Sequence, residues 1–301
     1  MIKIEFPQTK VLFILGSPRV GSTILYQFII NHFNCFFPSN RLNQSFIDGT
    51  WQSNLASLVE IGDEGVAYQS FYGKTIGDDQ PSEASALFKY FFGGEHPSET
   101  HSKEPIIHRK DLFLGLLEKI NGLVQKPMVF KNAWNCFRVA SLARLFPDSS
   151  FLWIRRDVAA AAYSDLLSRI NRGGPDVWNS ATTANVWEIK KLPYWEQVVE
   201  QQYSYTERLS IDLNEVGKER VAEVWYEDLC QKTSETFECL KTFLASAGFS
   251  LKVPNSDLPK LKLSDSFSRM KESEDGKKIL TYSSQKKFSH LRRLLENEEP
   301  F

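Results

Sequence analysis

The sequence predicts an α/β protein in three layers, with a mainly parallel sheet flanked by helices on both faces. Short apolar runs alternate along the whole chain with longer segments whose apolar residues recur at helical spacing, and this alternation is typical of parallel strands joined by helices. At 301 residues the chain is long enough for one large domain of this kind. No shift in composition marks a linker, so we expect a single domain over residues 1–301.

Each expected element follows from its own stretch of sequence. Strands are expected where a run is short, apolar and bounded by polar residues, and helices where apolar residues recur every three to four positions. The strands are expected at 11–16, 126–132, 149–156 and 219–229, and the helices at 21–33, 111–123, 136–146, 157–170, 194–217 and 233–249. Residues 40–105 are polar and weakly periodic, and we expect a mobile insertion or lid there.

Composition excludes several classes of function. The formal net charge is −1, so the chain lacks the basic excess by which many nucleic-acid-binding proteins attract phosphates. No apolar stretch approaches the roughly 18 residues of a membrane span, and the N-terminus lacks the pattern of a secretory signal. The four cysteines are scattered without a Cys-x-x-Cys pair, which is typical of reduced thiols. We therefore expect a cytoplasmic protein with no nucleic-acid partner, no metal and no membrane span; its oligomeric state is left open.

The first strand ends in an unusual turn with the sequence GSPRVGSTIL. In a parallel sheet, ligands bind at the carboxyl ends of strands, where the unpaired N–H groups of the next helix attract anions. Gly16 and Gly21 would let the backbone approach an anion closely. Ser22 and Thr23 add hydroxyl donors, and Arg19 adds a charged, planar donor fork. The turn therefore predicts a phosphate loop, although strand-turn-helix junctions that bind nothing also contain Gly and Ser.

This turn differs from the loop that binds nucleoside triphosphates. That loop follows the pattern G-x-x-x-x-G-K-[ST], whereas Gly21 is followed here by Ser22. A triphosphate site also needs a carboxylate that binds Mg²⁺, and no apolar strand of this sequence clearly ends in an aspartate. The pattern therefore favours an anion other than Mg-ATP.

A second junction has the same character. In FLWIRRDVAAAAYSDL, Arg156 ends a strand and Ser164 follows eight residues later, about two helical turns on. A side chain from a strand end and a hydroxyl from a helix can converge on one oxyanion, with Asp157 as the helix cap. Two exposed arginines and a serine on a helix surface would give the same pattern, so this segment alone leaves both interpretations open.

Together the two junctions resemble the sulfotransferase family, whose donor is 3′-phosphoadenosine 5′-phosphosulfate (PAPS). GSPRVGSTIL is similar to the family's 5′-phosphosulfate loop. Arg19, Gly21, Ser22 and Thr23 fall on the working positions of that loop, and Val20 replaces its usual small hydroxyl residue. The resemblance implies that these four residues bind the donor.

Two further segments extend the resemblance. RRDVAAAAYS is similar to the family's 3′-phosphate motif, whose Arg and Ser correspond to Arg156 and Ser164, with Val158 in place of a Pro. VWYEDL is similar to a strand end whose Tyr lies against the adenine, and Tyr226 takes that position, although a core tyrosine would also fit. The resemblance implies a P-loop-like sulfotransferase fold and metal-free transfer of a sulfuryl group from PAPS to a hydroxyl. The acceptor would be a small molecule, a lipid, a polyketide or a glycan, and the product 3′-phosphoadenosine 5′-phosphate (PAP).

The resemblance also implies catalytic roles. Arg19 would stabilise the leaving phosphate, and Lys131, at a strand end near the family's central lysine, would contact the transferred group, although a solvated lysine or one at the edge of the core fits equally well. Many relatives carry a His two residues after that lysine, where this chain has Ala133. Relatives that act on sugars or protein tyrosines use a Glu after the phosphosulfate helix, where this chain offers Asp48. We rank Asp48 and His108 level as candidates for the general base.

Two other functions stay open at this point. A kinase or nucleoside triphosphatase with an unusual P-loop would bind Mg-ATP, whereas a non-catalytic relative would bind the nucleotide and transfer nothing. The unplaced base favours the non-catalytic relative. The presence of Arg19, Arg156 and Ser164 favours an enzyme.

Overall fold

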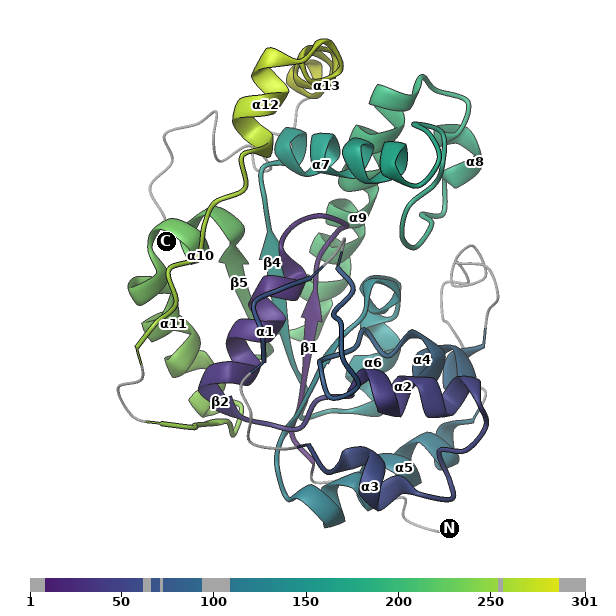
Figure 1. Cartoon of the computed structure of the whole chain (residues 1–301), viewed down its shortest axis with the longest axis vertical. Helices are drawn as coiled ribbons and strands as arrows, with labels where there is room; N and C mark the ends of the chain where they lie inside the picture. The colour runs from purple at the N-terminus through teal and green to yellow at the C-terminus, as the bar shows by residue number, and fades with distance from the viewer. Residues whose placement is uncertain (1–8, 62–65, 71–72, 94–108, 254–256, 287–301) are drawn as a thin grey trace.

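A parallel sheet of four strands forms the centre of the protein (Figure 1). The computed structural model describes residues 9–61, 66–70, 73–93, 109–253 and 257–286. Its strands lie in the order β3-β1-β4-β5 and every neighbouring pair is parallel; their bounds are β1 Val11–Leu15, β3 Met128–Lys131, β4 Ser150–Arg155 and β5 Val221–Trp225. A short antiparallel pair joins β2, Phe33–Asn34, to β6, Ser250–Leu251. The predicted α/β class with a mainly parallel sheet is confirmed.

Side chains of β1 alternate between two hydrophobic cores, because successive residues of a strand point to opposite faces. Phe13 belongs to the core on one face, together with residues of α4, α5, α6 and α9. Leu12 and Ile14 belong to the core on the other face, together with residues of α1 and α11. The bounds of these helices are α1 Ser22–His32, α4 Ser85–Phe92, α5 Lys110–Val124, α6 Val139–Leu145, α9 Tyr194–Val216 and α11 Thr233–Ser246. The sheet therefore lies between two helical layers.

Three short helices form in a region where the sequence predicts a weakly structured insertion. They are α2 (Asn40–Ile47), α3 (Leu55–Val59) and α4. Helices of this length are unstable alone and depend on tertiary packing. Here the stacked rings of Phe46 and Trp51, 5.0 Å apart, pack with Phe91 into the core. Burial of these aromatic rings therefore stabilises helices that the weak apolar periodicity of the sequence does not indicate. Residues 94–108 lie outside the described residues, and the mobility of the insertion stays a prediction.

A third group of helices lies at the end of the molecule where α12 and α13 stand above α7 (Figure 1). Alanines of α7 (Val158–Asn171) are buried and allow α9 and the C-terminal helices to approach closely. The remaining elements are η2 Ala133–Phe137, α8 Val186–Ile189, η3 Lys218–Arg220, α10 Tyr226–Gln231, α12 Ser266–Glu272 and α13 Glu274–Gln285. The predicted strand at 219–229 is thus shorter than expected, because the chain turns into α10 at Tyr226.

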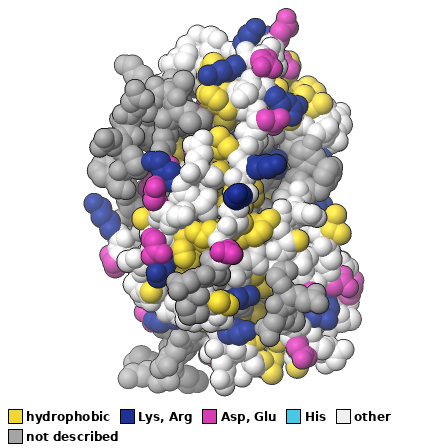
Figure 2. Space-filling model, turned by 60° about the vertical axis from the view of Figure 1, so that its left-hand side comes forward, with side chains coloured by type: hydrophobic (Ala, Val, Ile, Leu, Met, Phe, Trp, Pro, Cys, Tyr) yellow, Lys and Arg dark blue, Asp and Glu magenta, His cyan; other side chains and the backbone are white. Residues whose placement is uncertain are grey.

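The surface carries mixed charge. Figure 2 shows one face, on which basic and acidic side chains are interspersed with apolar ones. Within the part of the chain that the structure describes, no helix combines the length and hydropathy needed to cross a membrane. Because the surface is mixed in charge and the net charge is −1, a strongly positive site requires several basic residues close together.

Candidate functional site

The turn between β1 and α1 has the backbone geometry of an anion-binding loop. Gly21, which precedes α1, has φ 86°, a left-handed conformation that favours glycine, and a Cβ there would overlap the ring of Tyr226. At Gly16 a Cβ would lie 2.8 Å from the carbonyl oxygen of Ile154. No side chain caps α1, so the first N–H groups of the helix are left for another acceptor. Both glycines are therefore required by the close packing of the turn.

Side chains from other elements hold this turn in place. The backbone N–H of Gly16 donates to the buried Cys136 sulfur at 3.3 Å, and Gln202 of α9 donates to the Pro18 carbonyl oxygen at 2.9 Å. Burial raises the pKa of the Cys136 thiol to about 12, so this thiol stays protonated. These two contacts preorganise the Gly16 and Pro18 end of the loop without adding a charge.

The second predicted junction lies directly against the first. Arg156 Nη1 donates to the backbone carbonyl oxygen of Arg19 at 2.9 Å, and Arg19 Nε donates to Ser164 Oγ at 3.2 Å. Arg19 itself has φ 69°, a left-handed conformation that costs about 1–2 kcal/mol for a residue with a side chain. Asp157 caps α7 by accepting from the Ala160 N–H at 2.8 Å, as predicted. Residues 137 and 145 positions apart along the chain therefore form one cationic cluster.

Arg156 lies in a pocket built by the C-terminal part of the chain. Its Nη2 donates to Ser266 Oγ, and its guanidinium carbon lies 4.6 Å from the centre of the Tyr226 ring. The side chain is buried, and its Nε atom has no hydrogen-bond partner in the described structure. The N–H of Ser264 donates to the Tyr226 hydroxyl at 3.0 Å. The Ser264 hydroxyl donates to Ser266 Oγ at 2.9 Å, so a guanidinium and two linked hydroxyls meet here, which are groups that suit an anion.

A second set of side chains surrounds the end of β3. Lys131 is buried, and its ammonium forms an ion pair with Glu83 and lies 3.3 Å from Thr23 Oγ1. A Cβ at Gly73 would lie 3.5 Å from Glu83 Oε1 and 3.6 Å from Thr23 Oγ1. Asn132 fixes the position of Glu83 by donating to its backbone oxygen at 2.8 Å. A carboxylate, an ammonium and a hydroxyl thus meet beside the anion loop.

Both sets of residues line one cavity of about 450 Å³. The cavity is lined by every donor-binding residue that the sequence predicts and by two of the predicted catalytic residues: Arg19, Gly21, Ser22, Thr23, Lys131, Arg156, Ser164 and Tyr226. Among the described residues, no group of three or more His, Cys, Asp and Glu side chains could hold a metal ion. The cavity therefore gathers cations and hydroxyls at the carboxyl ends of β1, β3 and β4.

Comparison with family models decides to which family this arrangement belongs. The model described as the sulfotransferase family matches residues 12–247, which include both strand-helix junctions of the cavity, Lys131 and Glu83. The chain belongs to the sulfotransferase family. Comparison with curated protein sequences finds no match.

Solved sulfotransferase structures resemble this fold at low sequence identity. Sulfotransferase STF1 from Mycobacterium tuberculosis aligns with a TM-score of 0.53 and 13% identity, over 93% of this chain and 78% of that one. A sulfotransferase from Alicyclobacillus acidocaldarius has a TM-score of 0.43 and 14% identity, over 92% and 95% of the two chains. The sulfotransferase domain from the curacin biosynthetic pathway has a TM-score of 0.47 and 13% identity, over 92% and 98%. The first of these likenesses supports the fold of this sulfotransferase.

Of the two candidates for the general base, only Asp48 lies in the described part of the chain. Asp48 ends α2, where its exposed carboxylate accepts from Gln44 Nε2 at 2.9 Å, and it does not line the cavity. His108 lies outside the described residues. The only carboxylate among the described lining residues of this sulfotransferase is Glu83.

Sequence reasoning missed Glu83 and the two serines beside Arg156. Glu83 lies in a polar stretch just before α4, and only the tertiary fold brings it to Lys131, 48 residues later. Ser264 and Ser266 lie in a segment with no recognisable motif. Three serines near a predicted Arg site, counting Ser164, are too common a pattern to stand out in a single sequence.

Tyr226 lines the cavity but is almost fully enclosed. Only 3% of its surface is exposed; the ring lies over Gly21 and Arg156, and the hydroxyl accepts from the N–H of Ser264. Burial raises the pKa of this phenol to about 12, so the hydroxyl stays neutral. The ring therefore joins the turn after β1, the end of β4 and the C-terminal segment.

Proposed function

We propose that this sulfotransferase takes its sulfuryl group from PAPS and transfers it to an alcohol. The observation that carries the proposal is the contact between the two anion clusters, in which Arg156 donates to the backbone of Arg19 and Arg19 donates to Ser164. A nucleotide with separate 3′ and 5′ phosphates requires two such clusters in one cavity, whereas a triphosphate requires one continuous cradle. The donor would supply the activated sulfuryl group.

The residues of the cavity fit such a donor. The uncapped N-terminus of α1, with Ser22 and Thr23, suits the 5′ end, where Gly21 brings the backbone close. The unpaired Nε of the buried Arg156, with Ser164 and Ser266 nearby, suits the 3′-phosphate. Tyr226 contributes by positioning Arg156 and the loop, and its small exposed area limits its contact with the adenine.

Sulfuryl transfer to a hydroxyl has three requirements that the protein must meet. Charge must be stabilised on the departing phosphate oxygen, the sulfuryl oxygens must be held, and a proton must leave the acceptor. Arg19 and the N–H groups of the loop serve the first need. Lys131 and Thr23, which lie 3.3 Å apart, serve the second.

Glu83 serves the third need and is the general base of the proposal. Its side chain is 36% exposed, so an acceptor hydroxyl can reach the carboxylate, and it lies beside the Thr23 hydroxyl across Gly73. The carboxylate accepts the proton while Lys131 turns from Glu83 toward the sulfuryl oxygens. Asp48, exposed on α2 and outside the cavity, has no such access.

Two measurements test the proposal. PAP without magnesium should raise the melting temperature by several degrees at about 100 times its Kd, and Mg-ATP should not. Stabilisation by Mg-ATP and not by PAP would instead support a kinase or nucleoside triphosphatase. With labelled PAPS and a library of alcohols, label should pass to an acceptor; binding of PAP without transfer to any acceptor would support a non-catalytic relative.

A further inference from the structure

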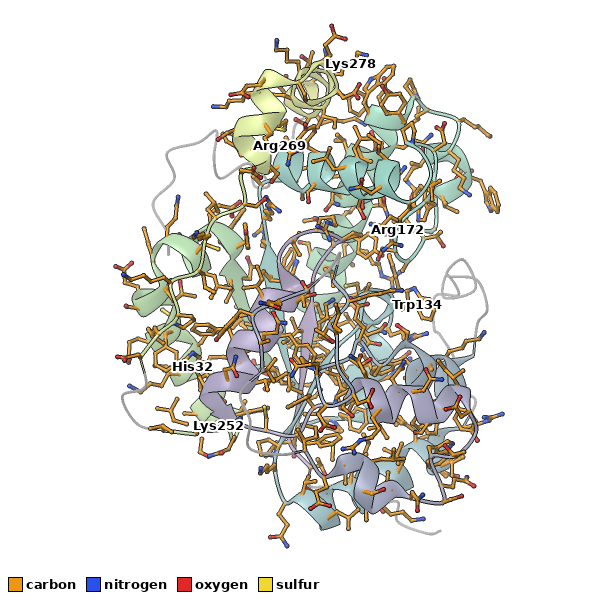
Figure 3. The ribbon with its side chains drawn as sticks, viewed as in Figure 1. His32, Trp134, Arg172, Lys252, Arg269 and Lys278 are labelled. Atoms are coloured by element: carbon orange, nitrogen blue, oxygen red, sulfur yellow. The ribbon has the colours of Figure 1, made fainter. Side chains whose placement is uncertain are left out.

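We infer that the acceptor of this enzyme carries an anionic group of its own, a carboxylate or a phosphate, on a skeleton with a flat apolar part. The inference rests on the proposed sulfotransfer function and concerns three lining residues to which that function gives no role: Arg172, Lys74 and Trp134. Figure 3 shows Arg172, at the end of α7, and Trp134, in η2, in the same region of the molecule.

Two of the three residues lie on the Glu83 side of the cavity. Lys74 follows Gly73, where an added Cβ would lie 3.5 Å from Glu83 Oε1. Trp134 is tied to Glu83 through Asn132, whose Nδ2 donates to the Glu83 backbone oxygen at 2.8 Å and whose Oδ1 accepts from the Trp134 N–H at 2.9 Å. An exposed cation and a half-buried indole therefore line the same cavity as the carboxylate that is proposed to receive the acceptor's proton.

Arg172 lies beyond the donor clusters. It follows Ser164 by eight residues, which places it about 12 Å further along α7 at 1.5 Å per residue. Its place is fixed by a buried network: Asp165 accepts from Arg169 Nε at 3.0 Å and from Asn179 Nδ2 at 2.7 Å, which ties the loop after α7 to the helix. Because Asn179 also lines the cavity, this network holds the whole loop against the site.

The other cations of the cavity already have partners within the protein, so Arg172 and Lys74 are the ones available to an acceptor. Arg19 contacts Ser164, Arg156 contacts Ser266 and Tyr226, and Lys131 pairs with Glu83. Neither Arg172 nor Lys74 forms an ion pair with any described residue. Two exposed cations without a carboxylate partner and a half-buried indole line the same concave site, and this set of groups matches an anionic ligand that also has an apolar face.

The test uses matched phenols and the PAP-bound protein. The probes are 3-(4-hydroxyphenyl)propanoate, its primary amide, and 2-(4-hydroxyphenyl)ethyl phosphate, which separate carboxylate, neutral and phosphate groups on one ring. Calorimetry at low salt should show that at least one anion binds about tenfold more tightly than the amide, because one charge-assisted contact is worth about that factor. Equal affinities, or no binding of either anion, would overturn the inference.

Variants assign the preference to its residues. Arg172→Ala and Lys74→Ala should each reduce the preference for the anion severalfold, Arg172→Lys should keep most of it, and Lys277→Ala, an exposed cation on α13 outside the cavity, should change nothing. PAP affinity should stay within about twofold in all four variants. Loss of PAP affinity in Arg172→Ala would place this residue at the donor and overturn the inference. A wild-type protein that does not bind PAP would overturn the proposed function itself.

Discussion

Glu83 forms an ion pair with Lys131 inside the cavity, and the same ammonium lies 3.3 Å from Thr23 Oγ1. The two charged residues come from different layers of the fold: Lys131 ends the parallel strand β3 of the sheet, and Glu83 precedes the flanking helix α4. Lys131 is buried and keeps one carboxylate partner in the free protein. Under the proposed function, sulfuryl oxygens beside Thr23 would compete with Glu83 for this ammonium, so donor binding would free the carboxylate to act as the base.

Glu83→Gln should lower kcat by about 10²–10⁴-fold, the range that a positioned general base contributes. The amide keeps the size of the side chain and accepts a hydrogen bond from Lys131, but it does not take up a proton. PAP affinity should change little, because the donor phosphates lie at other residues. Turnover at saturating PAPS and calorimetry with PAP measure the two effects.

Asp48→Asn is the matched control, since Asp48 is exposed and outside the cavity. It should leave kcat within about twofold. A large loss in Asp48→Asn together with normal turnover in Glu83→Gln would reverse the assignment of the base.

Arg156→Ala should weaken PAP binding by about 2–3 kcal/mol, because a buried, charge-assisted contact to the 3′-phosphate is lost. Adenosine 5′-phosphosulfate lacks that phosphate and should bind the variant and the wild type alike. Ser266→Ala should show the same selectivity with a smaller loss, because Ser266 contacts Arg156 and not the 5′ side. Calorimetry with both nucleotides decides the matter, and an equal loss for both would mean that Arg156 supports the fold of the loop.

The sequence shows the fold class and both anion clusters because each depends on local pattern. Strand, turn and helix follow one another within a few residues at the ends of β1 and β4, and glycines and hydroxyl residues mark the turns. The fold class and the four-stranded sheet could therefore be predicted, whereas α2 to α4, whose short helices depend on the packing of Phe46, Trp51 and Phe91, and the C-terminal helices α12 and α13 could not.

Glu83, Lys74 and Arg172 could not be recognised in the same way. Each lies in a polar segment without periodicity, and only the crossing of separate elements brings them to one cavity. The family resemblance points to a carboxylate in the segment after α1, and that segment offers Asp48 and no Glu. In space, the segment that reaches the end of β3 comes later, just before α4.

Two buried thiols should make the protein less stable above pH 9. Burial raises the pKa of Cys35 and of Cys136 to about 12, whereas an unfolded thiol titrates near 8.5. The native state therefore keeps protons that the unfolded state releases. The stabilisation is fully present below about pH 8.5 and is lost as the pH rises toward 12, at about 1.4 kcal/mol per pH unit for each thiol.

Urea unfolding of the wild type and of Cys136→Ala between pH 8 and 10 measures this effect. The variant should show a shallower decrease of the unfolding free energy with pH, whatever its stability at pH 8. Cys239→Ala is the control, because Cys239 is exposed, and its slope should equal that of the wild type. Equal slopes in all three proteins would contradict the prediction.

Arg19 should act mainly in the transition state. If it stabilises the departing phosphate oxygen, its contribution grows as that oxygen gains charge. Arg19→Ala should then lower kcat by about 10²–10³-fold, the effect of removing one preorganised donor. PAP binding should suffer less, because loop N–H groups and Ser22 still hold the 5′-phosphate, and Arg19→Lys should recover much of the rate because the charge persists.

The backbone at Arg19 separates this catalytic role from a structural one. Because φ is 69° there, Arg19→Gly relieves a left-handed conformation that Arg19→Ala retains, so Arg19→Gly should be more stable to urea than Arg19→Ala by up to about 1 kcal/mol. Both variants should nevertheless lose the same turnover in single-turnover transfer at saturating PAPS. A residue kept only for the turn would give the opposite result, with Arg19→Gly as active as the wild type, and unchanged turnover in Arg19→Ala would remove Arg19 from the mechanism.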